Sequence, residues 1–310
     1  MHKMKCNTLP FYEFRDGIYE VDEFDCVSMF VIVGSERSLV IDTGTGIGDF
    51  KWVVENRIIP NQPYDVVASH NHLDHIGGAG WFDEIYMHEA DIIHGEVKES
   101  NEDYDEFGPL ETIEDSANVT DRRKYAKIIS KREGKFYPYN LQDDILAWPK
   151  QPKWIPIRDK HVFDLGNRKV ICYHCPGHTK GELVFLDDLT RTLIVGDAVN
   201  CNFYFRTDLA ETPKEGLAIA YEAVKRIDDM KDQYDYVINS HHDYRGFGNP
   251  LDPETIGNLM HCLESLVNQT AEFNTVADPL SNDGDTRISA VFGNVEVSTF
   301  GKPAINELDN

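Results

Sequence analysis

The sequence predicts an α/β fold, in which helices cover β-sheets. Short apolar segments of strand length alternate with helical stretches along most of the chain, and this interleaving is typical of helix-covered sheets. With 310 residues, of which 41% are hydrophobic, the chain can also bury a substantial core. Together these two observations favour a globular α/β protein.

The first third of the chain has the pattern of a strand meander. Strands are predicted over 11–21, 27–33 and 38–42, with a tight connection at 34–37. The glycine-rich run at 44–48 follows. Its third glycine is one position early for a dinucleotide-binding fingerprint, so we interpret the run as a turn from a strand into a helix.

From residue 64 onward, short strands alternate with helices. Helices are predicted near residues 80 and 90 and over 213–230. The strands are predicted over 65–68, 84–87, 169–173, 183–186, 192–195 and 236–238. The last part of the chain adds an amphipathic helix over 253–267, followed by a hairpin of 288–292 with 295–300.

The segment from about 95 to 149 departs from this pattern and is interpreted as an insertion. Residues 96–115 are densely acidic, 122–135 are basic and 136–139 are aromatic. Two interpretations stay open, a solvated charged surface and a helical lid that shapes a substrate pocket.

Composition excludes several classes of partner. A formal net charge of −24 makes binding to nucleic acid or to an anionic membrane surface unfavourable. The first 14 residues lack a secretory core, no run of 18 apolar residues occurs, and six scattered cysteines are too sparse for a disulfide framework. We therefore expect a cytoplasmic protein that acts on a small-molecule substrate; the sequence leaves open whether it forms a homo-oligomer.

The strongest chemical signal is the run Ser69-His70-Asn71-His72-Leu73-Asp74-His75-Ile76-Gly77-Gly78, directly after a predicted strand. In an extended segment His70 and His72 point to the same side, so both imidazoles can reach one ion. The chain then turns, which can aim Asp74 and His75 at a neighbouring point. Imidazole nitrogen with carboxylate oxygen is a ligand set that suits zinc and related divalent ions.

Three further candidate ligands each follow a predicted strand. His178 lies in Cys175-Pro176-Gly177-His178-Thr179, Asp197 in Gly196-Asp197-Ala198, and His241 in Asn239-Ser240-His241-His242. Because ligand sites in α/β sheets gather at the carboxyl ends of strands, we expect these residues to meet the His70 to His75 run.

At these positions the sequence resembles the metallo-β-lactamase superfamily, with its pattern H-x-H-x-D-H, a Gly-His, a Gly-Asp and a late His. The resemblance covers about residues 10 to 245, includes the early Leu39-Val40-Ile41-Asp42-Thr43-Gly44, and implies a single domain over 1–310 with the fold of a four-layer αββα sandwich. It also implies that a first metal site is formed by His70, His72 and His178, a second by Asp74, His75 and His241, and a bridge between them by Asp197. Zinc is favoured, with iron and manganese as alternatives.

The resemblance implies a binuclear metal-dependent hydrolase. Two divalent ions lower the pKa of a shared water to about 7, so a metal-bridging hydroxide could attack an ester, thioester, lactone, lactam or phosphoester. Asp74 could also receive a proton. The run around His178 is similar to that of glyoxalase II-type thioesterases. The alternative is an oxidoreductase resembling persulfide dioxygenases, with a single iron.

Four residues near the expected ligands carry open alternatives. The late histidine usually sits between glycines, so His242 rivals His241 as the ligand. Asp42 could orient a ligand histidine or merely form a turn. Tyr204 or Arg206, which follow Asp197 closely, could contact substrate or serve in packing.

Overall fold

The first β-sheet contains seven strands in chain order. The computed structural model describes residues 9–23, 26–96, 111–133, 139–278, 285–299 and 304–308. The strands are β1 (Phe11–Arg15), β2 (Ile18–Glu23), β3 (Val27–Val33), β4 (Ser38–Ile41), β5 (Tyr64–Val67), β6 (Glu84–His88) and β7 (Lys153–Ile157). β1 to β4 pair antiparallel and β4 to β7 pair parallel. The single strand predicted over 11–21 is wrong, because the chain turns at Gly17, whose φ is 71°, and forms the β1–β2 hairpin.

Two further sheets follow. The second has the order β13-β11-β10-β9-β8, and the third has the order β12-β16-β15-β14. The strands of the second sheet are β8 (Val162–Asp164), β9 (Lys169–His174), β10 (Leu183–Asp187), β11 (Thr192–Ile194) and β13 (Tyr236–Ile238). Those of the third are β12 (Asn202–Phe205), β14 (Phe273–Ala277), β15 (Thr286–Phe292) and β16 (Val295–Thr299). The hairpin expected at 288–300 is β15–β16, although residue 300 lies outside the described residues.

The longest helices agree with the sequence patterns. They are α4 (Val119–Glu133), α6 (Pro213–Asp229) and α7 (Thr255–Val267); the shorter ones are α1 (Phe50–Val53), α2 (Leu73–Ile76), α3 (Ile113–Ala117) and α5 (Leu141–Asp144). α6 begins where it does because Thr212 and Glu215 form a capping box and Pro213 occupies the first helical position. The helices predicted near residues 80 and 90 are only single 3₁₀ turns, Ala79–Trp81 and Glu89–Asp91.

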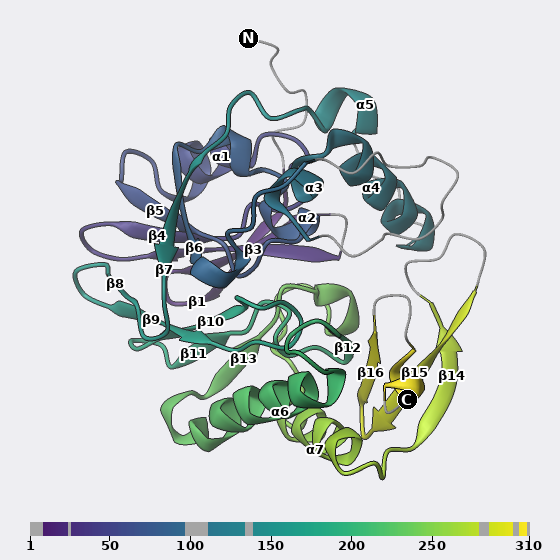
Figure 1. The fold of residues 1–310 in the computed structure, drawn as a ribbon. Helices are drawn as coiled ribbons and strands as arrows, with labels where there is room; N and C mark the ends of the chain where they lie inside the picture. The colour runs from purple at the N-terminus through teal and green to yellow at the C-terminus, as the bar shows by residue number, and fades with distance from the viewer. Residues whose placement is uncertain are drawn as a thin grey trace.

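The first two sheets pack face to face with helices outside them (Figure 1). The core between the sheets joins residues such as Phe30 and Ile41 of the first sheet to Phe185 and Ile194 of the second. α6 and α7 cover the outer face of the second sheet, and α7 also packs on the third. α1, α2 and the helices of the 95–149 segment lie on the outer side of the first sheet. The α/β class and the predicted layers are confirmed.

The described part of the 95–149 segment packs against the rest of the chain. Arg122, one of the basic residues that suggested a solvated surface, is fully buried in α4. Its guanidinium donates hydrogen bonds to the carbonyl oxygens of Thr45, Ala117 and Leu146 at 3.2, 3.2 and 2.9 Å. Residues 97–110, which carry most of the acidic run, lie outside the described residues. The role of the segment as a lid stays a prediction.

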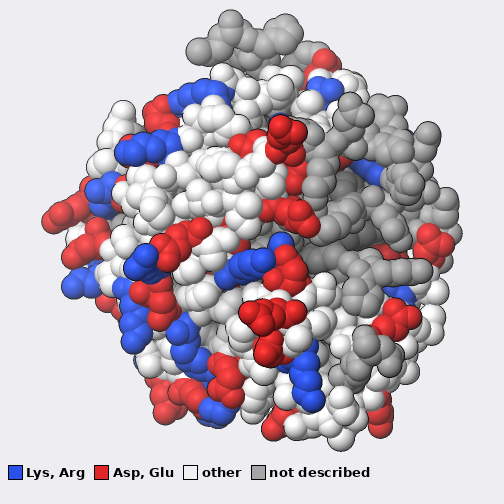
Figure 2. Space-filling view, in the orientation of Figure 1, with Lys and Arg blue, Asp and Glu red and all other residues white. Residues whose placement is uncertain are grey.

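Two further features concern the charged side chains on the surface and the length and hydropathy of the helices. On the face drawn in Figure 2, acidic side chains are interspersed with basic ones. Among the described helices, none has the length and hydropathy required to cross a bilayer.

Candidate metal centre

The seven predicted ligands come from four places in the chain and meet beside the edge where the two facing sheets end. His70 and His72 follow β5, and Asp74 and His75 lie in the single turn of α2. His178, Asp197 and His241 follow β9, β11 and β13 of the second sheet. The Leu183 amide donates to the Ser69 carbonyl at 2.9 Å, which ties β10 to the loop that carries the first ligands.

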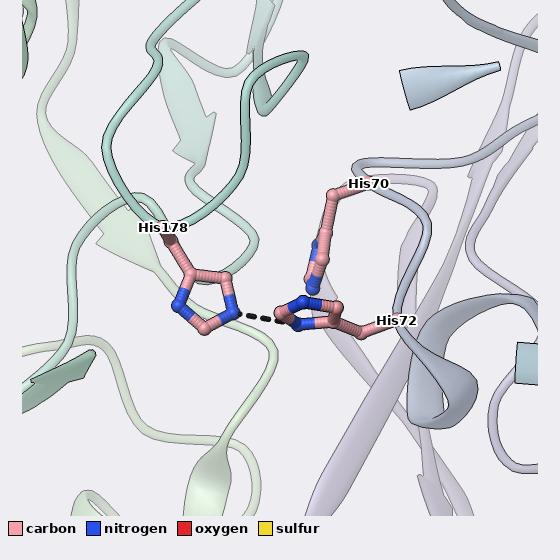
Figure 3. A group of neighbouring side chains, drawn as sticks. All are labelled: His70, His72 and His178. Atoms are coloured by element: carbon pink, nitrogen blue, oxygen red, sulfur yellow. Dashed lines mark hydrogen bonds between the residues drawn. The ribbon is translucent and has the colours of Figure 1, made fainter. Parts of the chain in front are cut away.

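Three histidines form the first group that could hold a metal ion. One nitrogen each of His70, His72 and His178 lies within 4.8 Å of the others. Figure 3 shows the three imidazoles turned toward one another, with His178 Nε2 at 2.9 Å from His72 Nδ1. This agrees with the group expected for the first metal site.

Asp74, His75 and His241 form the second such group. Asp197 lies between the two groups, because its Oδ2 is 3.6 Å from His75 Nε2, 3.6 Å from His178 Nε2 and 3.1 Å from His241 Nε2. A carboxylate in this position can reach a cation in either group. All seven predicted residues are therefore brought together.

Buried polar atoms without partners indicate that the clustered residues fit a cation. Three buried atoms of the clustered residues, His70 Nε2, His75 Nε2 and Asp197 Oδ1, have no hydrogen-bond partner. A buried polar atom left unpaired costs about 1–3 kcal/mol, and such atoms need an explanation in a native fold. Unpaired imidazole nitrogens beside a carboxylate oxygen are the donors that zinc and related ions prefer.

Contacts behind the cluster fix how the imidazoles point. His75 Nδ1 donates to Asp42 Oδ2 at 2.9 Å, and His178 Nδ1 donates to the carbonyl oxygen of Tyr204 at 3.0 Å. His70 Nδ1 lies 3.0 Å from Ser69 Oγ and 3.3 Å from Glu182 Oε2. Because Nδ1 is engaged in these contacts, Nε2 is the nitrogen that each ring directs toward the centre.

Asp42 contacts a ligand histidine, in agreement with the first of the two roles considered for it. Its carboxylate also accepts from the Ser69 amide at 2.6 Å and from Ser69 Oγ at 2.9 Å. Its φ of 64° lies in the left-handed region, which Asp and Asn adopt more readily than most residues.

Glu182 and Tyr125 also contact the centre, although the sequence patterns did not single them out. Glu182 is fully buried, and its Oε1 accepts from the Asp197 amide at 3.1 Å. A Cβ at Gly196 would lie 2.5 Å from that same oxygen, so the approach requires glycine. Tyr125 of α4 donates its hydroxyl to Asp74 Oδ2 at 2.9 Å.

The direction of the histidine pKa shifts differs between the two groups. Burial, together with the neighbouring imidazoles, lowers the pKa of His70 and of His72, and burial lowers the pKa of His178. Burial also opposes protonation of His75, but the carboxylates of Asp74, Asp197 and Asp42 raise its pKa well above the usual value. The first group is thus in the neutral form that binds metal, whereas His75 holds a proton that a cation would displace.

The rival late histidine faces away from the cluster. His242 Nδ1 contacts Ser28 Oγ at 2.7 Å, and its Nε2 lies 2.9 Å from Asp22 Oδ1. In contrast, His241 Nε2 lies 3.5 Å from Asp74 Oδ2. The geometry therefore favours His241 as the candidate ligand.

Tyr204 and Arg206 are held by other residues. The Tyr204 hydroxyl accepts a hydrogen bond from Arg287 Nη1 at 2.7 Å. Tyr204 contacts the cluster through its carbonyl oxygen, which accepts from His178 Nδ1. The Arg206 guanidinium pairs with Asp208, Nη2 donating to Oδ2 at 3.0 Å. Contact of either side chain with a substrate stays a prediction.

Comparison with known proteins agrees with the cluster and the layers. The profile of the metallo-beta-lactamase superfamily matches residues 22–232. Acyl-coenzyme A thioesterase MBLAC2 of Bos taurus is 26% identical over 199 residues, which cover 59% of this chain and 64% of that protein. The chain thus matches less than two thirds of that curated relative.

Solved structures share the fold at low identity. A beta-lactamase domain protein from Burkholderia ambifaria has a TM-score of 0.51 and 15% identity, covering 86% of this chain and 80% of that one. The sec-alkylsulfatase Pisa1 from Pseudomonas sp. has a TM-score of 0.54 and 15% identity, covering 85% of this chain and 43% of that one. With the superfamily profile matched over residues 22–232, which include six of the seven clustered residues, the chain belongs to the metallo-beta-lactamase superfamily.

Proposed function

We propose that this chain is a hydrolase that holds two zinc ions and cleaves a thioester of a small acyl compound. The observation that carries the proposal is the pair of ligand groups that meet at Asp197. The thioester is favoured among the substrates expected from the sequence for two reasons. The run around His178 resembles that of glyoxalase II-type thioesterases, and the curated relative is named as an acyl-coenzyme A thioesterase.

In this proposal His70, His72 and His178 would hold one cation, and Asp74, His75 and His241 would hold the other, with Asp197 between the two groups. Divalent cations in such a site lower the pKa of bound water to about 7 and polarise the oxygen of a carbonyl group. Asp42 and the Tyr204 carbonyl keep Nε2 of His75 and of His178 directed at the centre.

The reaction adds water across the acyl–sulfur bond. The water oxygen bonds to the acyl carbon, the carbon–sulfur bond breaks, and the thiol leaves with one of the water protons. Asp74 is the proposed proton acceptor, because its carboxylate lies among the ligands and is the conjugate base of a weak acid.

The second ligand group is what favours hydrolysis over the mononuclear-iron alternative. An oxygenase with one iron requires only the first group, whereas Asp74, His75 and His241 supply a second. We therefore expect two zinc ions per chain rather than one iron.

The test combines elemental analysis with a substrate panel. Protein purified without chelator should contain two zinc ions per chain and hydrolyse thioesters faster than lactones, lactams or phosphodiesters. His70→Ala and Asp197→Ala should each lose metal and turnover. The matched control is His88→Ala, because His88 stacks on His174 rather than facing the cluster. Full metal content in both cluster variants would overturn the ligand assignment, and one iron with persulfide-dependent oxygen uptake would favour the oxygenase.

A further inference from the structure

Tyr125 links the inserted segment to one ligand of the candidate metal centre. Its hydroxyl donates to Asp74 Oδ2 at 2.9 Å, across 51 positions of sequence. The side chain is buried, since the residue is only 6% exposed. The contact is therefore shielded from the water that weakens exposed hydrogen bonds.

α4 is anchored so that Tyr125 keeps this position. The buried side chains Arg122, Tyr125, Ala126 and Ile129 follow the spacing of one helix face. Arg122, one turn before Tyr125, fastens that face by donating to the carbonyl oxygens of Thr45 and Leu146.

Two other residues of the segment hold the ends of the ligand loop. Ser116 Oγ donates to the Asn71 carbonyl oxygen at 2.5 Å, and Trp148 Nε1 donates to the Gly77 carbonyl oxygen at 2.7 Å. Asp74 lies between these two contacts in sequence. The segment thus contacts the loop before, at and after the carboxylate that belongs to the second ligand group.

We propose that Tyr125 is a positioning residue for Asp74, so that the inserted helices set the affinity of the second ligand group for its cation and leave the first group unaffected. Asp74 belongs only to the second group. Its Oδ2 lies 3.5 Å from His241 Nε2 and 3.8 Å from His75 Nε2, so this oxygen faces both partner ligands. A carboxylate can rotate about its last side-chain bond, and the phenol hydroxyl opposes that rotation.

The inference rests on the proposed two-cation site and is tested by stepwise metal titration. Loss of a hydrogen bond behind a metal ligand weakens binding by about 10- to 100-fold. Tyr125→Phe removes one oxygen atom and keeps the ring. In a zinc titration against a chromophoric chelator, the second ion should bind about 10- to 100-fold more weakly to the variant while the first binds as in wild type.

The matched control is Tyr139→Phe, because the Tyr139 hydroxyl lies 3.3 Å from Ser130 Oγ within the same segment. That variant should bind both ions as wild type does. Melting temperatures measured in chelator check that both variants fold.

Each remaining outcome decides the matter. Unchanged affinity for both ions in Tyr125→Phe, or equal weakening of both, would overturn the inference and leave the proposed function standing. Wild-type protein that binds fewer than two ions would overturn the proposed function, and this inference with it.

Discussion

Replacing Asp42 by Asn should weaken metal binding by about 30-fold while the chain stays folded. Asn tolerates the left-handed φ of 64° and keeps one oxygen for the Ser69 amide, which lies 2.6 Å from Asp42 Oδ1. The other oxygen becomes an NH₂ group that faces His75 Nδ1, also a donor, at the 2.9 Å contact. A hydrogen bond to a charged group contributes about 1.5–3 kcal/mol, and ~2 kcal/mol corresponds to a factor of about 30.

The assay is competition with a chromophoric zinc chelator, run beside melting curves of the metal-free proteins. The matched control is Asp65→Asn, because Asp65 on neighbouring β5 pairs with Arg37 at the surface side of the strand. That variant should bind zinc as wild type does. Equal zinc affinity in Asp42→Asn and Asp65→Asn would refute the reasoning, because it would mean that the orientation of His75 does not depend on Asp42.

Three further predictions concern stability. Arg122→Met leaves the carbonyl oxygens of Thr45, Ala117 and Leu146 without this donor, so we expect the free energy of unfolding to fall by about 3 kcal/mol. The melting temperature should then fall by about 5–10 °C, and a value within about 2 °C of wild type would contradict the prediction. Burial raises the pKa of Asp91 to about 6 although Thr179 and Gly181 donate to its carboxylate. That folded-state pKa exceeds the unfolded value near 3.8, so the stability linked to protonation of Asp91 is present below pH 4 and is lost as pH rises through 6. The free energy of unfolding of Asp91→Asn should therefore rise relative to wild type by up to about 3 kcal/mol between pH 4 and 8. A difference in denaturant midpoints that does not change with pH would exclude this. Removing metal should lower the melting temperature, since an ion at 1,000 times its Kd stabilises the folded state by about 4 kcal/mol, and scanning calorimetry with and without chelator measures the shift.

Local patterns predicted the ligand cluster because its members sit in short, recognisable runs. His70 and His72 are separated by one residue and follow an apolar strand, so their common side could be predicted from strand geometry. The other three ligand segments each follow a strand, and strand ends meet at an edge. The choice between His241 and His242 could not be read in the same way, because it depends on Asp22 and Ser28, which lie far away in sequence.

Long-range contacts explain what the sequence did not predict. Tyr125 shows the spacing of a buried helix face with Ala126 and Ile129, but that spacing does not identify Asp74 as its partner. Glu182 was not predicted because it follows Thr179-Lys180-Gly181, just before β10, where a glutamate normally indicates a solvent-facing position. β7 was missed because Pro156 interrupts its pattern, and proline is tolerated there because β7 is an edge strand of its sheet.

The third sheet gives the last residues of the chain a part in supporting the centre. Phe203 and Tyr204 of β12 pair in parallel with Val297 and Ser298 of β16. The Tyr204 carbonyl oxygen, in β12, accepts the hydrogen bond from His178 Nδ1. A fragment ended at residue 232, where the superfamily profile stops, would lose both His241 and the neighbour that keeps β12 in register. The part of the chain that supports the candidate metal centre therefore extends about 65 residues past the region that the superfamily profile matches.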